Sequence, residues 1–406
     1  MTTNAPLKGI RVLELGQMIA VPAATHVLAS YGAEVIKVED TAAGDGLRFY
    51  GSQKHGVSGW FINSNWGKRS IALDIKSDAG QAVLWSLIET ADVFVEGYRS
   101  GVIERLGFGY EAVKTKNPNI VYCASSGYGA TGPYSDQPVY DPLIQGLTGW
   151  AGIQQQDGKP TLVRSMIADK IGAMTNAQAI MAALIKRGTT GQGSHVQVSM
   201  LEANLAFVWP DVMMDCTLLD EDVDQRPNVL NAYRLYDCQD GLVAIAPGAD
   251  RHWEAMCEAL GPSYYADERF HSFAGRGQYN REWMDTIDQM VAPYAVATVV
   301  ERLRAAQVPV APVLNPREVY ADPQINATHL LRESHHPSGG RIRHPRPASA
   351  FFGIDIQLSP APVQGEHSDQ ILAELNISAE QRAQLFAQNV VKQGVPEPAT
   401  PHPAPD

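Results

Sequence analysis

Residues 9–39 read GIRVLELGQMIAVPAATHVLASYGAEVIKVE, and this stretch indicates the fold. The segment that begins at Gly9 is rich in branched apolar residues, which is typical of a buried strand. The helical pattern AATHVLAS follows, Gly32 supplies the helix stop, and a second strand ends at Glu39. We therefore predict a strand, a helix and a second strand, the βαβ unit of a parallel sheet.

The same alternation continues along the chain. We expect further strands at residues 70–75, 92–96 and 119–126, and a helix at residues 79–91. Strands that alternate with amphipathic helices, joined by right-handed crossovers, predict an α/β protein with a Rossmann-like, doubly wound large domain.

The chain divides into four predicted regions. Residues 1–214 form the N-terminal part of the large domain, 215–325 a linker and a smaller α+β domain, 326–391 a return to the large domain, and 392–406 a disordered tail. The smaller domain opens with a hairpin, because Asp240 and Gly241 lie between two β-rich runs. The last 12 residues contain five prolines, which favours disorder.

Composition excludes several classes of protein. A formal net charge of -12 argues against a nucleic-acid partner, because phosphate binding needs a basic surface. The four cysteines are widely spaced and form no CxxC pair, so they indicate neither a disulfide framework nor a zinc site. The chain carries no signal-peptide pattern and no run of roughly 18 apolar residues. We expect a cytoplasmic protein without a membrane span.

Two motifs suggest a dinucleotide site and a metal site, but the sequence around each of them argues against that function. Gly127, Gly129 and Gly132 match GxGxxG after a strand, but Pro133 and polar residues follow where a dinucleotide-binding turn needs a helix. We therefore interpret this segment as a glycine-rich loop. The adjacent His335 and His336 are expected in a loop, and the chain has no HExxH, so no metal site is predicted.

Several segments in order resemble the class III CoA-transferases, the CaiB/BaiF type, which include formyl-CoA transferase, carnitine CoA-transferase and the α-methylacyl-CoA racemases. The resemblance covers roughly residues 7 to 391 and is far more specific than one short motif. The segments that carry it are LKGIRVLELG (7–16), YGAEVIKVE (31–39), NWGKRSIALDIK (65–76), ADVFVEGYRSGVIERLGFGYEAV (91–113), NIVYCASSGYGATGP (119–133), ADK (168–170), ALIKRGTTGQGSHVQVSML (183–201) and GEHS (365–368).

The resemblance implies that Asp169 is a carboxylate nucleophile. A carboxylate can hold an acyl group as an anhydride and then CoA as a thioester, as CoA transfer between two acids requires. Residues 160–168 lead into a helix expected to begin near Lys170, so the helix dipole and free N–H groups would keep Asp169 ionised and could stabilise an oxyanion. Sequence logic alone favours a simple N-cap over a nucleophile, because aspartate is a preferred cap, and the resemblance reverses this preference.

By the same resemblance, CoA or acyl-CoA should bind the large domain as a substrate, with no permanently bound cofactor and no metal. The implied contacts are Met18, Ile19, Leu73, Lys76, Gly97, Tyr98, Arg99 and Arg105. Basic side chains suit phosphate groups, although a single Lys or Arg is more often solvated surface. Family members often carry a basic residue after the position of Glu39, where this chain has Asp40, Thr41 and Ala42, and the formyl-CoA enzyme has one at Pro138. Either Arg48 substitutes, or the adenine end is held differently.

Tyr140 and Asp141 resemble the family's active-site pair, with Asp141 either orienting its partners or closing a loop. The related racemases carry histidine at the position of Tyr140 and use it to move an α-proton, a task for which tyrosine is poorly suited. The covering glycine-rich loop of the formyl-CoA enzyme is not recognisable between Pro247 and Trp253. The sequence therefore favours oxalate as the acceptor no more than succinate or substituted dicarboxylates.

The resemblance thus implies transfer of CoA from an acyl-CoA donor to a small free carboxylic acid, through aspartyl anhydride and aspartyl-CoA thioester intermediates, in an interlocked homodimer. Two alternatives remain at this point. One is an acyl-CoA racemase or epimerase on the same scaffold, which would exchange an α-proton. The other is a non-catalytic CoA-binding protein, which would bind CoA without turnover.

Overall fold

The computed structural model describes residues 4–156, 158–224, 229–349, 351, 354 and 356–398. Their contacts divide the chain into two compact units. Unit 1 contains the residues up to Trp209 and those from Leu330 onward, and unit 2 runs from Pro210 to His329. Each unit has its own apolar core. The division into four regions that we predicted from the sequence stays a prediction.

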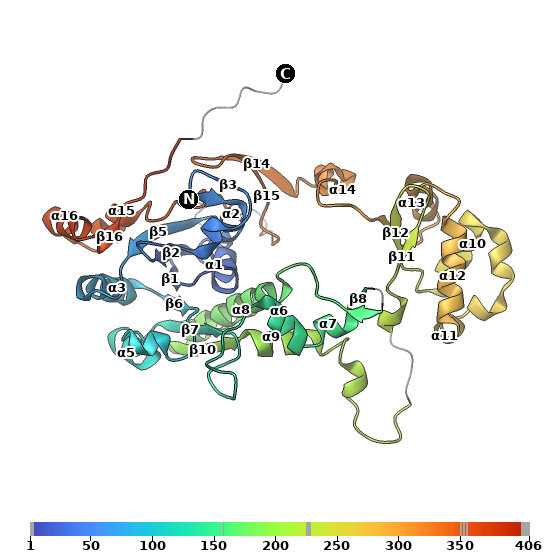
Figure 1. Cartoon of the computed structure of the whole chain (residues 1–406), viewed down its shortest axis with the longest axis horizontal. Helices are drawn as coiled ribbons and strands as arrows, with labels where there is room; N and C mark the ends of the chain where they lie inside the picture. Colours follow the sequence, from blue (N-terminus) through green and yellow to red (C-terminus); the bar gives the residue numbers. More distant parts are fainter. Residues whose placement is uncertain are drawn as a thin grey trace. The chain divides into compact units, whose positions relative to one another are not determined.

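Unit 1 is built on a sheet with the strand order β10-β7-β6-β1-β2-β5-β16 (Figure 1). Neighbouring strands are parallel except β16, which is antiparallel to β5. The chain runs from β1 through β2 to β5, then returns to β6 on the other side of β1, so the strand order reverses between β1 and β6. The strands are β1 (Arg11–Leu15), β2 (Glu34–Glu39), β5 (Lys68–Leu73), β6 (Val93–Glu96), β7 (Val121–Ser126), β10 (Ser194–Ser199) and β16 (Val391–Lys392).

Helices cover both faces of this sheet. Successive side chains of a strand point to opposite faces, so each face has its own apolar cluster for helices to pack against. Val12 of β1 packs in an apolar cluster with α1 (Ala20–Ser30) and α8 (Ile167–Thr190). Its neighbour Leu13 packs in a second cluster with α3 (Asp78–Thr90) and α15 (Ser368–Glu374). Figure 1 shows α3 and α8 on opposite sides of the strands. The predicted βαβ start and the mainly parallel sheet are confirmed.

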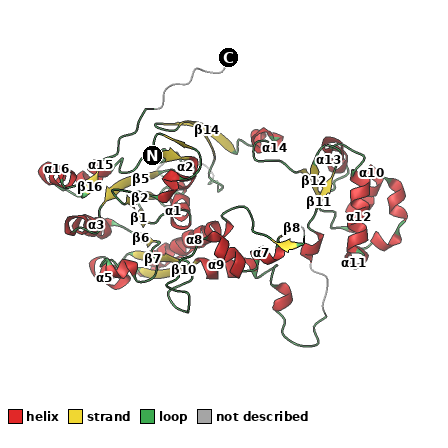
Figure 2. Ribbon diagram, viewed as in Figure 1, coloured by secondary structure: helices red, strands yellow, loops and turns green. Residues whose placement is uncertain are grey.

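Shorter elements complete unit 1 (Figure 2). His335 and His336 were expected in a loop, but both lie in a strand that pairs with the next one, so that prediction is wrong. The glycine-rich residues 127–140 contain no helix, as predicted. The shorter elements are α2 (Gly59–Asn65), α4 (Val102–Arg105), α5 (Tyr110–Lys116), α6 (Asp141–Leu147), α7 (Trp150–Ile153), α9 (Met200–Val208), α16 (Ala379–Ala387), β3 (Gln53–Lys54), β4 (Val57–Ser58), β8 (Gln155–Gln156), β9 (Lys159–Pro160), β14 (Leu331–His336) and β15 (Gly340–Pro345).

Unit 2 is a small antiparallel sheet with helices. Trp253 is fully buried at its core and meets Phe270 and Trp283 edge-on. The hairpin predicted around Asp240 and Gly241 is confirmed as β11 and β12. The elements are β11 (Leu235–Asp237), β12 (Leu242–Ile245), β13 (Val310–Pro312), α10 (Asp250–Leu260), α11 (Phe273–Gln278), α12 (Asn280–Val291), α13 (Val296–Ala305) and α14 (Pro323–Ala327).

Parts of two predicted segments lie outside the described residues, namely 225–228 of the linker and 399–406 of the tail. Lys392, the first residue of the predicted tail, pairs with Ala72 at the edge of the large sheet. None of the helices in the described ranges is long and apolar enough to cross a membrane.

Candidate active site

Asp169 lies in the first turn of α8. The helix begins at Ile167, and the side chain of its N-cap residue, Met166, makes no capping hydrogen bond. Asp169 is therefore the third residue of the helix and not its cap, so the predicted start near Lys170 is wrong. Ala168, which precedes Lys170, is fully buried and already belongs to the helix.

The carboxylate that caps α8 belongs to Asp141, the first residue of α6. Its Oδ2 accepts hydrogen bonds from the backbone N–H of Ala168 at 2.7 Å and of Asp169 at 3.1 Å. Asp141 is 5% exposed, so little water competes for these donors. The expectation that these N–H groups are free to stabilise an oxyanion is therefore wrong for both. Asp141 does orient the turn that carries Asp169.

The carboxyl group of Asp169 is more basic than an ordinary aspartate. Burial, and then the negative charge of Asp141, raise its pKa from 3.8 to about 6. This direction is opposite to our expectation that the helix dipole keeps the group firmly ionised. The carboxyl group is still mostly ionised at neutral pH, where a more basic carboxylate is also a stronger nucleophile.

Gln145 is a site residue that the sequence analysis missed. It is 1% exposed, and its Nε2 donates to Asp141 Oδ1 at 2.6 Å. The only sequence signal is its spacing of four residues from Asp141 on one helix, which places both side chains on the same face. Tyr140, by contrast, is 66% exposed and sits directly before α6.

The N-terminus of α8 lies at the edge of the sheet formed by the carboxyl ends of the parallel strands. At its other end Arg187 forms a salt bridge with Asp92, which precedes β6. Near its beginning, Ala168 O accepts a hydrogen bond from Asn204, in the helix that directly follows β10. The helix therefore runs antiparallel to the strands and presents Asp169 at their carboxyl ends.

Most of the predicted CoA contacts lie at this same edge. Met18 and Ile19 follow β1, Leu73 ends β5 with Lys76 just beyond, and Gly97, Tyr98 and Arg99 follow β6. In open α/β sheets, ligands bind outside the carboxyl ends of the strands, where the strand order reverses. Here that point lies between β1 and β6, so the fold supports this placement independently of the resemblance.

The loops after β1 and β6 approach each other closely. A Cβ atom on Gly97 would lie 3.0 Å from a methyl group of Val21 and 3.9 Å from the Cα of Gly16, so a larger residue would crowd the two loops. Met18 has φ 64°, a left-handed conformation, and its N–H donates to Asp45 Oδ1 at 3.1 Å. The loop is therefore held in one shape by a buried carboxylate.

Three exposed cations also lie near this edge. Within the described part of the chain, Lys76, Arg99 and Arg105 form no salt bridge, so their charges are available.

Arg48, which we considered as a substitute phosphate ligand, is 4% exposed and binds both carboxylate oxygens of Glu39. Its guanidinium group is also 3.6 Å from the ring centroid of Phe61. Arg48 is therefore a structural cation, and its substitution for the missing basic residue is not supported.

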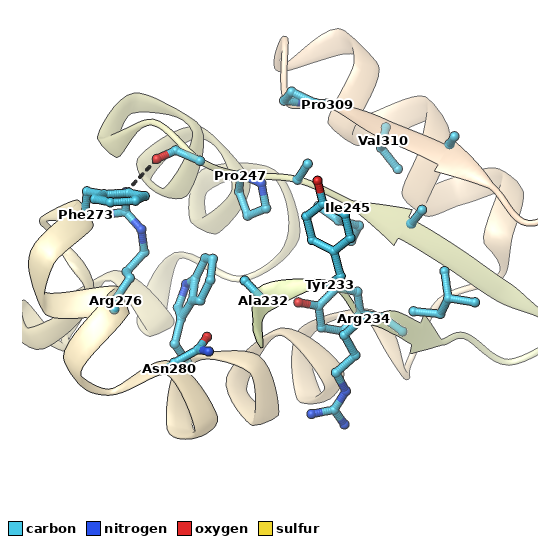
Figure 3. A pocket seen from close by; sticks show the side chains of 18 of the residues that line it. Ala232, Tyr233, Arg234, Ile245, Pro247, Phe273, Arg276, Asn280, Pro309 and Val310 are labelled. Atoms are coloured by element: carbon cyan, nitrogen blue, oxygen red, sulfur yellow. Dashed lines mark hydrogen bonds between the residues drawn. The ribbon is translucent and has the colours of Figure 1, made fainter. Parts of the chain in front are cut away.

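A large cavity of about 1240 Å³ lies entirely within unit 2 (Figure 3). Ile245, Pro309 and Val310 line its sheet side, and Phe273 and Arg276 line its helix side. None of the predicted site residues lines it. Among the described residues, no group of three His, Cys, Asp or Glu side chains is placed to hold a metal ion.

Comparison with known proteins agrees with the fold. Residues 7–368 match the sequence profile of CoA-transferase family III. The succinate–glutarate CoA-transferase of Agrobacterium fabrum is 31% identical over 383 residues, covering 91% of this chain and 96% of that enzyme. The succinyl-CoA:mesaconate CoA-transferase of Haloarcula hispanica is 33% identical over 394 residues, covering 91% and 96%. The crystal structure of a CaiB/BaiF family protein from Brucella suis matches with a TM-score of 0.80 at 28% identity, covering 92% of this chain and 100% of that protein. The chain therefore belongs to CoA-transferase family III.

Proposed function

We propose that this protein transfers CoA from an acyl-CoA thioester to a free carboxylic acid, with Asp169 as the nucleophile. The observation that carries the proposal is the half-buried Asp169 carboxyl group, whose pKa is raised to about 6 at the carboxyl edge of the sheet. An electron-rich carboxylate can attack a thioester, and exclusion of water by the bound substrate would let the resulting anhydride survive long enough to react.

The proposed reaction has four steps. The Asp169 carboxylate attacks the thioester carbonyl and expels CoA thiolate, which leaves a mixed anhydride. The thiolate then attacks the aspartyl carbonyl, releases the donor acid and forms an aspartyl-CoA thioester. The acceptor carboxylate attacks this thioester, forms a second anhydride and again expels the thiolate. Attack of the thiolate on the acceptor carbonyl releases the new acyl-CoA and regenerates Asp169.

The partner residues have separate proposed roles. Asp141 holds the first turn of α8 and keeps the Asp169 carboxylate basic, while Tyr140 donates a hydrogen bond to the acyl group. CoA lies across the loops that contain Met18, Leu73 and Gly97, and the phosphates meet the exposed cations Lys76, Arg99 and Arg105. The relatives are named for succinate, glutarate and mesaconate, so we propose succinyl-CoA as donor and a dicarboxylate as acceptor.

We also propose that the active form is an interlocked homodimer. Unit 1 exposes large apolar side chains on α6, α8 and α9, and apolar surface of this kind commonly marks a protein interface. The side chains are Leu143, Leu147, Met174, Ile185, Leu205 and Phe207. Their burial by a second copy would remove apolar surface from water.

The test is a transfer assay with succinyl-CoA and a panel of dicarboxylates, with products separated by chromatography. We expect a new acyl-CoA that requires both substrates and is lost in Asp169→Ala. Glu380→Ala, which removes an exposed carboxylate from the first turn of α16, should leave transfer unchanged. Deuterium uptake at the α-carbon without an added acid would instead identify a racemase. Binding of CoA without any turnover would identify a non-catalytic protein.

A further inference from the structure

Gln145 connects two segments near Asp169. Its Nε2 donates to Asp141 Oδ1 at 2.6 Å and lies 3.2 Å from the carbonyl oxygens of Val163 and Ser165. Its Oε1 accepts from Val163 N at 2.9 Å. One side-chain amide thus joins α6 to residues 163–165, the segment that leads into α8.

Asp141 depends on this amide for one of its two oxygens. Oδ2 accepts hydrogen bonds from the backbone of α8, and Oδ1 accepts one from the side-chain amide of Gln145. A buried acceptor that loses its donor is unfavourable, so it moves or takes up a proton. Either response would weaken the cap on α8 and would change the electric field at Asp169.

We propose that Gln145 is a positioning residue that holds Asp141 and, through Asp141, the turn of α8 that carries the nucleophile. This proposal rests on the function proposed above. Gln145 need not touch substrate. Its effect is to fix both the location of the Asp169 carboxylate and the negative charge beside it, which positions the reacting atoms before substrate arrives.

Few other charges can act on Asp169. Of the titratable groups around α8, Asp141 is the one whose charge raises the pKa of Asp169, after burial. Those on elements packed against α8 are His26 on α1, Asp141 on α6, Tyr122 and Cys123 on β7, His195 on β10 and Glu202 on α9, and α8 itself carries Lys170, Lys186 and Arg187. Loss of Gln145 should therefore lower the pKa of Asp169 by disturbing Asp141.

The test compares Gln145→Met, which keeps the side-chain length but removes the amide, with the wild type. We expect kcat to fall about 10- to 100-fold while KM for the acyl-CoA changes less than about twofold. The acid limb of the kcat profile should move to lower pH. Asn117→Leu is the matched control, because Asn117 also donates to two backbone carbonyls, of Ile88 and Ala91, but lies in another part of unit 1. It should lose stability while kcat and the pH profile stay unchanged.

Two further measurements keep the outcome decisive. If Gln145→Met does not fold, Gln145→Asn keeps the amide but is too short to reach all its partners, and the same loss in kcat is expected. Carbon-13 NMR of aspartate-labelled protein, assigned with Asp169→Asn, reads the titration of Asp169 without turnover. An unshifted titration and unchanged kcat in a folded Gln145 variant would overturn the proposal. A wild type that titrates as described but transfers no CoA would instead overturn the proposed function.

Discussion

Two groups of carboxylates in unit 1, one around the fully buried Glu14 and one around the half-buried Asp169, have pKa values that shift in opposite directions. Below the loop after β1, Glu14 lies 2.7 Å from Lys37 Nζ and 2.8 Å from Lys68 Nζ. Burial opposes its ionisation, but the two ammonium groups outweigh burial and lower the pKa of Glu14 to about 2. At Asp169 no cation among the described residues offsets burial, and Asp141 adds a second negative charge, so the pKa of Asp169 rises to about 6. The neighbours of a buried carboxylate therefore decide whether it is inert or reactive.

The neutralised group has a structural task. Lys37 Nζ donates to Gly16 O at 2.7 Å and forms an ion pair with Asp45 Oδ2 at 2.8 Å, while Lys68 Nζ donates to Pro22 O at 2.7 Å. These contacts and the hydrogen bond from Met18 fix the shape of the loop after β1. The charges are balanced, so the loop is rigid without becoming chemically reactive.

The largest stability effect is expected where the charges are balanced. Glu14→Gln leaves two buried ammonium groups without their shared carboxylate and should lower the free energy of unfolding by about 3–5 kcal/mol. Urea unfolding at pH 7 measures this loss. Glu34→Gln is the control, because Glu34 pairs with Arg11 and Arg69 but is 34% exposed, so the loss should stay below about 1 kcal/mol. Equal losses in the two variants would contradict the contrast.

The opposite change in the free energy of unfolding is expected at Asp169, which lies beside a second carboxylate, Asp141. The folded-state pKa of Asp169 lies above its ordinary value of 3.8, so its ionisation destabilises the fold as pH rises through about 6. Asp169→Asn should therefore raise the free energy of unfolding by about 1–3 kcal/mol at pH 8 and have little effect below about pH 4. Thermal or urea unfolding at both pH values tests this. A loss of stability at pH 8 would show that interactions in the folded protein offset the cost of ionising Asp169.

A smaller effect is expected on the pH dependence of the reaction. The acid limb of kcat/KM should lie near pH 6, because a protonated Asp169 is not a nucleophile. Asp141→Asn removes the neighbouring charge and should move this limb to lower pH, although burial keeps it above the ordinary aspartate range. Asp136→Asn, at an exposed position in the loop before α6, should leave it in place. If the acid limb of kcat/KM stays in place in Asp141→Asn, the charge of Asp141 does not raise the pKa of Asp169.

The sequence predicted the parts of this site that depend on local pattern. Apolar runs and glycine stops located β1, α1 and β2, and a glycine-rich segment broken by Pro133 was rightly not given a helix. What it missed depends on contacts across the fold. The cap on α8 comes from Asp141, 27 residues before Ala168, and no local rule identifies so distant a partner. The direction of the pKa shift of Asp169 also depends on burial and on that partner, so a helix-dipole argument gave the wrong sign.

The most direct test of the account is mass spectrometry of the protein after incubation with acyl-CoA donors, including succinyl-CoA and acetyl-CoA. Hydroxylamine would trap activated carboxyl groups, and peptide mapping would locate them. We predict a hydroxamate at Asp169 that appears only with a donor and is absent in Asp169→Ala. CoA binding without labelling of Asp169 by any donor would contradict its role as the nucleophile.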